Sequence, residues 1–442
     1  MRDFAVTAVI LGLLPFSLIH PWIGILTWSW IGYMNPHRLT FGYAYDLPFG
    51  AVVMGATLLG LPFTKHRKGL PGSIEVFLLL ALWGWFFITT MFAFYPAEAW
   101  IHFVKVSKIL LGVFLTLVLF QDARRLQLLI WVIAGSIGFF GLKGGLFTLA
   151  TGAQHSVLGP PDSFLEGNTE MGLALNMCIP LIVYLQRQEQ RFWRRRALMA
   201  GSILCIIASL STYSRGALLG LAVVVPMLFL KSRARLILLP LLIIAVTVLP
   251  AVMPAGWLNQ METIEGYKED LSANQRLNSW FVSYELAKDN PVMGGGFRTF
   301  SEEIYNMYMP GYRFAGSEHD AHSIYFQVLG EHGFTGLALF VGLLASTLVS
   351  LRRLVRQTRK NPEQQWICNC AQMVEVGVVG YVVSGTFLSM SYFDLFYHLV
   401  AITVLLKVLV KTPVPEAVAG GAVSAPALPT PALAGPARRA RT

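Results

Sequence analysis

Long apolar runs recur along this chain of 442 residues and constrain its fold more than any other feature. Most of them approach the ~20 residues that an α-helix needs to cross a bilayer. Hydrophobic residues make up 55% of the chain and charged residues only 13%, which is unusual for a soluble protein of this size. We therefore predict an all-α polytopic membrane protein.

Basic residues gather in the short segments between the apolar runs and account for the formal net charge of +10. This pattern is the positive-inside signal, which predicts that these segments are cytoplasmic. No basic, aromatic-rich soluble domain is present, so we do not expect a nucleic-acid partner. The clusters are KHRK at Lys65, DARR at Asp122, RQEQRFWRRR at Arg187, KSRAR at Lys231 and RRLVRQTRK at Arg352.

The apolar runs predict about twelve spans. The first is expected to be broken at His20-Pro21, because counting it as two full spans would place the KHRK cluster outside. Both chain ends are then cytoplasmic. The expected spans lie near 4–33, 44–64, 72–94, 102–120, 126–150, 169–186, 197–213, 215–230, 234–253, 323–350, 371–389 and 391–410.

Four regions follow from this topology. Residues 1–253 form a transmembrane bundle of about nine spans, and residues 323–410 add about three more. Between them, residues 254–322 form a long periplasmic loop with one helical stretch at 274–289, bounded by Asn290-Pro291. Residues 411–442 are rich in Pro and Ala and are expected to be a disordered cytoplasmic tail.

Among the basic residues on the predicted outer side, against the charge bias, three arginines stand out: Arg215, Arg276 and Arg298. Ser214 is a suitable N-cap for a helix beginning at Arg215. An arginine at a helix N-terminus makes an anion site. The alternative is that Arg215 is an interfacial anchor whose side chain reaches the headgroups.

Polar residues also lie at two other helix starts on the predicted outer side. Asn168 or Thr169 is expected to cap one, and His322-Ser323 to open the other. A helix N-terminus disfavours imidazolium, so His322 is expected to be neutral and able to accept a proton. The alternative is a histidine that only satisfies a loop carbonyl. His319 is a weaker candidate.

Glycines follow His322 in the same apolar helix. Gly333 and Gly336 are expected to share one helix face with His322 and to allow close approach of a neighbouring helix. The GGGF stretch at Gly294 indicates a tight turn and not a nucleotide loop.

A metal site is not favoured. Glu318, His319, Asp320 and His322 are possible ligands, but they are clustered on one loop with no distant partner. The four cysteines lie in apolar runs or beside a basic loop and indicate no disulfide framework, and Cys368-x-Cys370 is weak evidence for a metal.

Two short motifs resemble signatures of bacterial O-antigen ligases. His322-Ser323, nine residues and then Gly333-Phe-Thr-Gly336 fit the H-[NSQ]-x9-G-x-x-[GTY] signature, and Arg215-Gly-Ala-Leu-Leu219 fits R-x-x-x-L. The stretch from Arg276 to Phe297 is similar to the Arg, Trp, Pro and Gly-x-Gly segment of the wider ligase and polymerase superfamily. The region around HPWIGILTWSWIGYMNPHRLTFGYAYDLPFG resembles the exosortase-associated branch of putative O-glycosylation ligases.

The resemblance implies a GT-C-like, inverting glycosyltransferase of the bacterial inner membrane, independent of metal and ATP. It implies transfer of O-antigen polysaccharide from undecaprenyl pyrophosphate to a hydroxyl of lipid A–core oligosaccharide on the periplasmic side. A diphosphate leaving group needs fixed cations, for which Arg215 and Arg276 are the first candidates and Arg298 the third. His322 is the candidate base. Tyr213, Asn168, His319 and Lys143 are candidate substrate-binding residues.

Other functions remain open at this point. An O-antigen polymerase and a protein O-oligosaccharyltransferase use the same donor with another acceptor. A transporter would need ionisable residues within the membrane, for which Lys105, Lys108 and Lys143 are candidates. Lys143, in GLKGGLF, could line a path for a lipid phosphate or for a solute.

Overall fold

The computed structural model describes residues 1–65, 67–232, 253–262, 271–311 and 320–411, together with residues 240, 247 and 248. Every regular element in these ranges is a helix, which confirms the predicted all-α class. The 411–442 tail, apart from its first residue, and most of the predicted span 234–253 lie outside the described residues.

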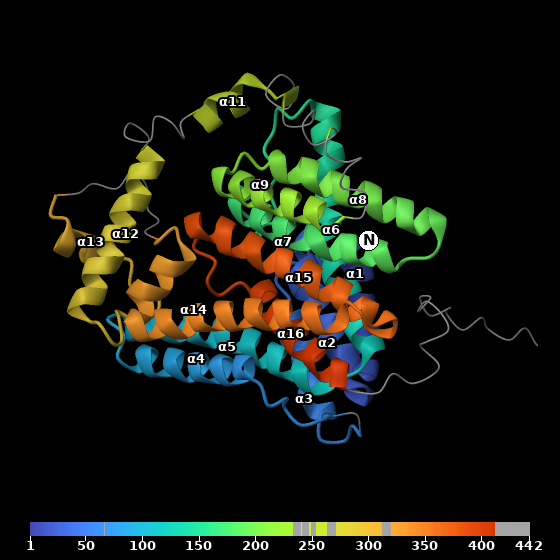
Figure 1. Cartoon of the computed structure of the whole chain (residues 1–442). Coiled ribbons are helices and arrows are strands. Elements are labelled where there is room, and N and C mark those ends of the chain that lie inside the picture. Colours follow the sequence, from blue (N-terminus) through green and yellow to red (C-terminus); the bar gives the residue numbers. More distant parts are fainter. Residues whose placement is uncertain are drawn as a thin grey trace, which may run out of the picture.

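The helices follow one another without intervening strands in the described part of the chain (Figure 1). They are α1 (Arg2–Ile19), α2 (Pro21–Met34), η1 (Pro36–Leu39), α3 (Phe49–Gly60), α4 (Ile74–Met91), α5 (Pro96–Leu119), α6 (Ala123–Thr151), α7 (Asn168–Gln188), α8 (Phe192–Leu210), α9 (Arg215–Leu230), α11 (Ala255–Glu262), α12 (Leu271–Asp289), α13 (Glu302–Tyr308), α14 (Ile324–Thr358), η2 (Pro362–Gln364), α15 (Gln365–Ser384), η3 (Gly385–Phe387) and α16 (Asp394–Lys411).

Among the described residues, seven helical segments are long and apolar enough to cross a membrane. They are α1, α4, α5, α6, α7, α14 and the segment Pro362–Phe387, which contains α15. The chain is therefore a membrane protein, but this count is lower than the twelve predicted spans. Helices α8 and α16 occupy two further predicted spans, and α3 and α9 are apolar but shorter.

Prolines lie at the ends of the helices in the first part of the chain. The break predicted at His20-Pro21 is confirmed, because α1 ends at Ile19 and α2 begins at Pro21. The predicted span at 44–64 contains only the 12 residues of α3. Pro48 precedes this helix and Pro62 follows it, and proline favours helix starts and disfavours helix interiors.

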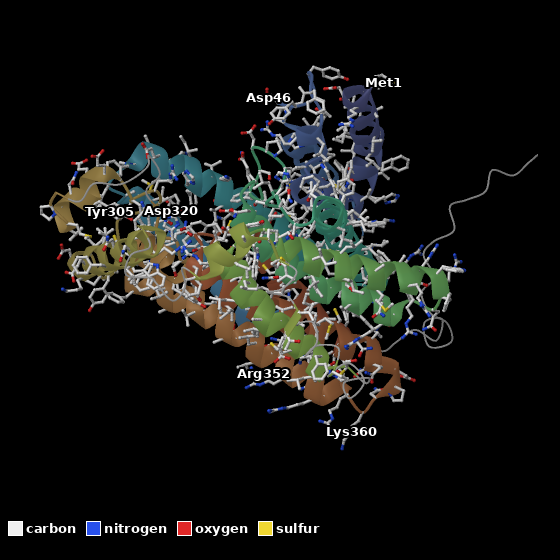
Figure 2. The ribbon with its side chains drawn as sticks, turned by 90° about the horizontal axis from the view of Figure 1, so that it is seen from above. Met1, Asp46, Tyr305, Asp320, Arg352 and Lys360 are labelled. Atoms are coloured by element: carbon white, nitrogen blue, oxygen red, sulfur yellow. The ribbon has the colours of Figure 1, made fainter. Side chains whose placement is uncertain are left out.

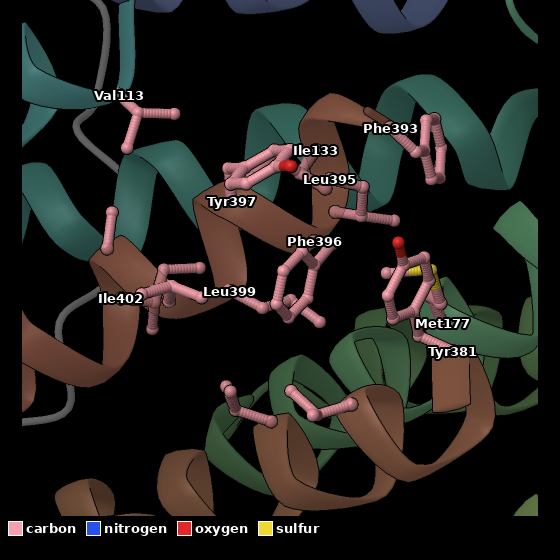
Figure 3. Close-up of a cluster of buried hydrophobic side chains, with 14 of the residues drawn as sticks. Val113, Ile133, Met177, Tyr381, Phe393, Leu395, Phe396, Tyr397, Leu399 and Ile402 are labelled. Carbon is pink, nitrogen blue, oxygen red and sulfur yellow. The ribbon is translucent and has the colours of Figure 1, made fainter. Parts of the chain in front are cut away.

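Two helices form the centre of the bundle. Every residue of α16 from Leu395 to Leu406 is buried, and so is every residue of α7 from Met171 to Ile182. A helix that is buried on all sides must be surrounded by other helices. Figure 3 shows this core around α16, where the ring of Phe396 stacks on that of Tyr381 with centroids 4.7 Å apart.

Ion pairs join the ends of helices that the basic clusters predict to be cytoplasmic. Glu75, at the start of α4, pairs with Lys407, near the end of α16, at 2.7 Å. Glu375 of α15 pairs with Lys231, just after α9, at 2.7 Å and with Arg352 of α14 at 3.0 Å. The structure therefore gathers these helix ends at one end of the bundle.

The segments predicted to be periplasmic contact one another at the opposite end. The Phe94 N–H donates to the Gly295 carbonyl at 2.9 Å, and the hydroxyls of Tyr95 and Ser301 are 2.8 Å apart. Figure 2 shows Asp320 at this end, while Arg352 lies towards the other.

Helices α12 and α13 lie together beside the start of α14, apart from the main bundle (Figure 1). They share a small apolar core in which Val282 and Leu286 of α12 are buried with Ile304 and Tyr305 of α13. The predicted helix at 274–289 is confirmed, with its end at Asp289 as expected and its start at Leu271.

Candidate active site

The turn between α8 and α9 places Arg215 at the first position of α9. The Ser214 hydroxyl accepts a hydrogen bond from the Ala217 N–H at 3.2 Å, which confirms the predicted N-cap. The N–H groups of this helix start carry a partial positive charge beside the guanidinium. The local geometry is therefore that of an anion site.

Two predicted substrate-binding residues hold this turn. Tyr213 has a left-handed backbone with φ of 58°, and its hydroxyl donates to the Ala153 carbonyl at 2.6 Å. The Asn168 amide donates to the Thr212 carbonyl at 2.8 Å. Asn168 is the first residue of α7 and Gly167 is the N-cap, so the expected capping by Asn168 or Thr169 is wrong. The Asn168 side chain instead crosses to the neighbouring turn.

His322 lies immediately before α14. Its φ is 48°, and the Ser323 hydroxyl caps the helix by accepting from the Tyr325 N–H at 3.3 Å. Asp320 is within electrostatic reach of His322 and accepts a hydrogen bond from the Ala321 N–H at 2.7 Å. Burial raises the pKa of Asp320 above its ordinary value.

An aromatic cluster connects the helices that carry the three predicted catalytic residues. The ring of Trp280, one turn after Arg276 on α12, stacks on Phe326 of α14 with centroids 5.1 Å apart and lies 6.1 Å from Phe387. A Cβ at Gly216, beside the first residue of α9, would lie 3.5 Å from the Phe387 Cβ. The starts of α9 and α14 and the middle of α12 thus meet around these rings.

Left-handed backbones concentrate among the predicted residues. Such conformations cost energy in residues other than glycine and persist most often at functional sites. Tyr213, Arg298 and His322 were all predicted from the sequence. The described non-glycine residues with positive φ are Asn35, Ala153, Asp162, Tyr213, Arg298 and His322.

Helix α14 is interrupted at Gly333, where φ is 67° and ψ is −172°. The expectation that His322, Gly333 and Gly336 share one face of a continuous helix is therefore wrong. A Cβ at Gly333 would lie 2.5 Å from the Val292 carbonyl oxygen, so the residue admits a loop and not a neighbouring helix. A Cβ at Gly336 would approach Trp85 of α4 at 3.4 Å, so a helix does pack there.

The glycine-rich turn after α12 docks on this interruption. The Gly295 and Gly296 N–H groups donate to the carbonyls of Gly330 and Glu331 at 2.9 and 2.8 Å. Gly296 has φ of 83°, as a tight turn requires. The sequence interpretation of GGGF as a tight turn is thereby confirmed.

Arg298 follows that turn and is fixed through its backbone. Its N–H donates to one carboxylate oxygen of Glu331 at 3.0 Å. The Tyr392 hydroxyl donates to the other oxygen. Glu331 is 2% exposed, so both of its oxygens depend on these partners. His332 lies beside it and is bonded to Thr89 at 2.7 Å and Tyr392 at 2.8 Å, as expected for a packed histidine.

A cavity of about 150 Å³ opens between α5, the start of α14 and the segment that precedes α16. Arg298 lines it, together with two carboxyls and with two basic residues of α5. The charged and polar residues that line it include His102, Lys105, Arg298, Asp320, Glu331 and Tyr392. Sequence reasoning missed His102, Glu331 and Tyr392 as members of a site. Glu331 was detectable as a charged residue inside an apolar run.

Lys143 is exposed on α6 and does not line the cavity. His319 lies outside the described residues, as does Glu318. Within the described ranges no group of three or more His, Cys, Asp or Glu side chains is arranged to hold a metal ion.

Together, the fold and the site define a helical membrane protein in which arginines, a histidine and capped helix starts converge at one end of the bundle. Residues 200–341 match a family model described as O-antigen ligase, and residues 1–190 match one described as a family of unknown function. A search of curated proteins gave no match. Residues 200–341 are therefore similar to an O-antigen ligase domain.

Proposed function

We propose that this protein is an inverting glycosyltransferase that moves O-antigen polysaccharide from undecaprenyl pyrophosphate to a hydroxyl of lipid A–core oligosaccharide. The match of residues 200–341 to the O-antigen ligase family model supports lipid-linked transfer chemistry. The observation that carries the proposal is the meeting of α9, α12 and α14 around Trp280, which brings the segments of Arg215, Arg276 and His322 to one end of the bundle.

In this proposal the arginines stabilise the leaving group. A diphosphate gains negative charge as its bond to the sugar breaks, and guanidinium groups and helix N-termini stabilise that charge. Arg215 supplies both, because it is the first residue of a capped helix. Arg276 lies on α12, one turn before Trp280 of the aromatic cluster.

His322 acts as the base. The acceptor oxygen forms a bond to the anomeric carbon, its proton moves to the imidazole, and the bond from that carbon to the diphosphate breaks on the opposite face. The electron pair leaves with the diphosphate, which stays on its lipid. One displacement of this kind inverts the anomeric centre. The residues present can perform the reaction without adding a redox or covalent step.

We place the reaction on the periplasmic face of the bacterial inner membrane. The separation of the basic helix ends from the end with His322 supports this orientation. A polymerase or a protein O-oligosaccharyltransferase would use the same donor. These alternatives differ from the proposed function in the acceptor that receives the glycan.

Complementation of a bacterial strain that lacks its O-antigen ligase tests the proposal. The wild-type chain should restore polymer-capped lipopolysaccharide on a gel, and His322→Ala should abolish capping while inserting at a normal level. A loss of about 10²–10⁴-fold is expected for removal of a general base. Full capping by His322→Ala would remove this residue as the base. Longer polymers without capping would identify a polymerase.

A further inference from the structure

The connection that precedes α7 folds back on itself beside the cavity. The Gly159 N–H donates to the Glu166 carbonyl at 3.1 Å, and the Asp162 N–H donates to the Glu166 carboxylate at 3.1 Å. A Cβ at Gly159 would collide with the Leu165 carbonyl oxygen, so glycine is needed for this close approach. Leu165 is buried in the main core. Residues 159–166 therefore form a closed loop that is anchored to the bundle, and we call it the 159–166 loop.

Phe164 of this loop forms part of the cavity wall. Its ring centroid lies 3.9 Å from the ammonium of Lys105, which lines the same cavity from α5. A cation at this distance from a ring is attracted to it electrostatically. The wall of the cavity on this side thus depends on where the 159–166 loop places Phe164.

The connection between α2 and α3 contacts the same loop. The Tyr45 hydroxyl donates to the Asp162 carboxylate. The Arg38 guanidinium lies 4.5 Å from the Tyr45 ring centroid, and its nitrogen is 3.7 Å from a carboxylate oxygen of Asp162. Asp162 has a left-handed backbone with φ of 50°, and such a conformation persists where the surroundings hold it. Tyr45 and Arg38 are two of the groups that hold it.

The start of α1 holds this connection in turn. The Asp3 carboxylate accepts hydrogen bonds from the Gly42 and Ala44 N–H groups at 3.0 and 3.1 Å. Helix α1 therefore begins at the end of the bundle that carries the cavity, and the predicted cytoplasmic start of the first span is wrong. The physical reason is that the break at Pro21 reverses the chain, so that α1 and α2 pack as an antiparallel pair.

We propose that Tyr45 and Asp162 are positioning residues, through which the first three helices hold the 159–166 loop beside the cavity and keep Phe164 against Lys105. Neither Tyr45 nor Asp162 lines the cavity, so both act through Phe164. The proposal gives a role to part of the segment that matches a family of unknown function. A part of the cavity in glycan transfer rests on the proposed function, whereas the placement of the loop rests on these contacts.

Tyr45 is the more informative of the two residues to change. The Asp162 side chain is 59% exposed, so its ion pair with Arg38 contributes little. A hydrogen bond from a hydroxyl to a charged carboxylate is stronger than one between neutral groups. Tyr45→Phe removes this bond and keeps the ring that lies against Arg38.

Hydrogen exchange measured by mass spectrometry tests the hold on the loop. The full chain would be studied in lipid nanodiscs, and the peptide that contains residues 159–166 would be followed. Exchange should be at least about threefold faster in Tyr45→Phe than in the wild type. Tyr43→Phe is the matched control, because Tyr43 lies in the same connection and is 60% exposed, and it should leave the exchange unchanged.

The position of Phe164 can be read at Lys105 by NMR. Reductive methylation with ¹³C-formaldehyde labels the lysines and keeps their charge, and Lys105→Arg identifies the Lys105 signal, which the Phe164 ring shifts. Tyr45→Phe should move this signal towards its position in Phe164→Leu. Asp162→Asn should move it less, because asparagine tolerates the left-handed backbone and its amide oxygen can accept from Tyr45. Tyr43→Phe should not move it.

Two results would overturn the proposal. One is unchanged exchange together with an unchanged Lys105 signal in Tyr45→Phe. The other is faster exchange with an unmoved Lys105 signal, since the loop would then loosen without displacing the cavity wall.

These measurements need no donor, acceptor or transfer. A moved Lys105 signal in Tyr45→Phe, combined with no detectable glycan transfer by the wild type, would support the positioning role and refute the proposed function. Glycan transfer by the wild type, combined with an unmoved signal in Tyr45→Phe, would do the reverse.

Discussion

Replacement of Gly333 by alanine tests the link between the helix break and the rest of the site. The backbone there, with φ of 67° and ψ of −172°, lies in a region that is essentially restricted to glycine. Alanine in such a region costs about 1–3 kcal/mol. Its Cβ would also lie 2.5 Å from the Val292 carbonyl oxygen and 2.8 Å from that of Pro291, which forces the backbone to move. We expect a total loss of about 2–4 kcal/mol.

Gly342→Ala is the matched control on the same helix. A Cβ at Gly342 would lie 3.9 Å from Leu78, which is an ordinary contact. Alanine should stabilise that helical position by about 0.5–1 kcal/mol, because glycine carries more backbone entropy when unfolded.

Thermal unfolding in detergent, followed by tryptophan fluorescence, would compare the two variants. Gly333→Ala should unfold at a clearly lower temperature than the wild type and should lose glycan transfer, because the turn that carries Arg298 is displaced. Gly342→Ala should match or exceed the wild type. Equal unfolding temperatures and equal transfer for the two variants would refute the reasoning from backbone geometry.

Three further variants probe the site. Arg215→Lys should lower transfer at least about tenfold, since a lysine cannot reproduce the paired donors of a guanidinium. Wild-type turnover by this variant would indicate that Arg215 is only an interfacial anchor. Asn168→Ala should lower transfer and destabilise the protein by about 0.5–1.5 kcal/mol, because the Thr212 carbonyl loses the shorter of its two hydrogen bonds and keeps the one from the Ser156 hydroxyl; an unchanged melting temperature would contradict this. Burial raises the pKa of Asp320 above its ordinary value of 3.8, so the folded protein binds this proton more tightly than the unfolded chain does. The resulting gain in the free energy of unfolding is fully present below pH 3.8 and is lost as the pH rises through the raised pKa. Asp320→Asn should remove this pH dependence from the free energy of unfolding measured across pH. An unchanged pH dependence would show that Asp320 is not its source.

Local chemistry made several elements predictable from the sequence. Ser214 and Ser323 cap the helices that they were expected to cap, because an N-cap depends on a few adjacent residues. Pro21 ends the first helix for a similarly local reason. The grouping of Arg215 with His322 at one end of the bundle followed from counting spans between basic clusters.

Features that depend on contacts between distant residues could not be predicted from the sequence. The break at Gly333 exists because the turn after α12 donates hydrogen bonds to the carbonyls of Gly330 and Glu331. No pattern in α14 alone reveals that partner. The presence of Lys105 in the cavity lining depends on which way α5 is turned, and its apolar neighbours on several sides leave that rotation undetermined by the sequence. Short α3 was overestimated because its flanking residues are also apolar.

The stereochemistry of the new glycosidic bond tests the central claim most directly. The purified protein would be given a defined undecaprenyl-diphosphate-linked glycan and a lipid A–core acceptor, and NMR would assign the anomeric configuration of the donor and the product. A single displacement with His322 as base predicts inversion. Retention of configuration would require a covalent glycosyl intermediate and would contradict the account.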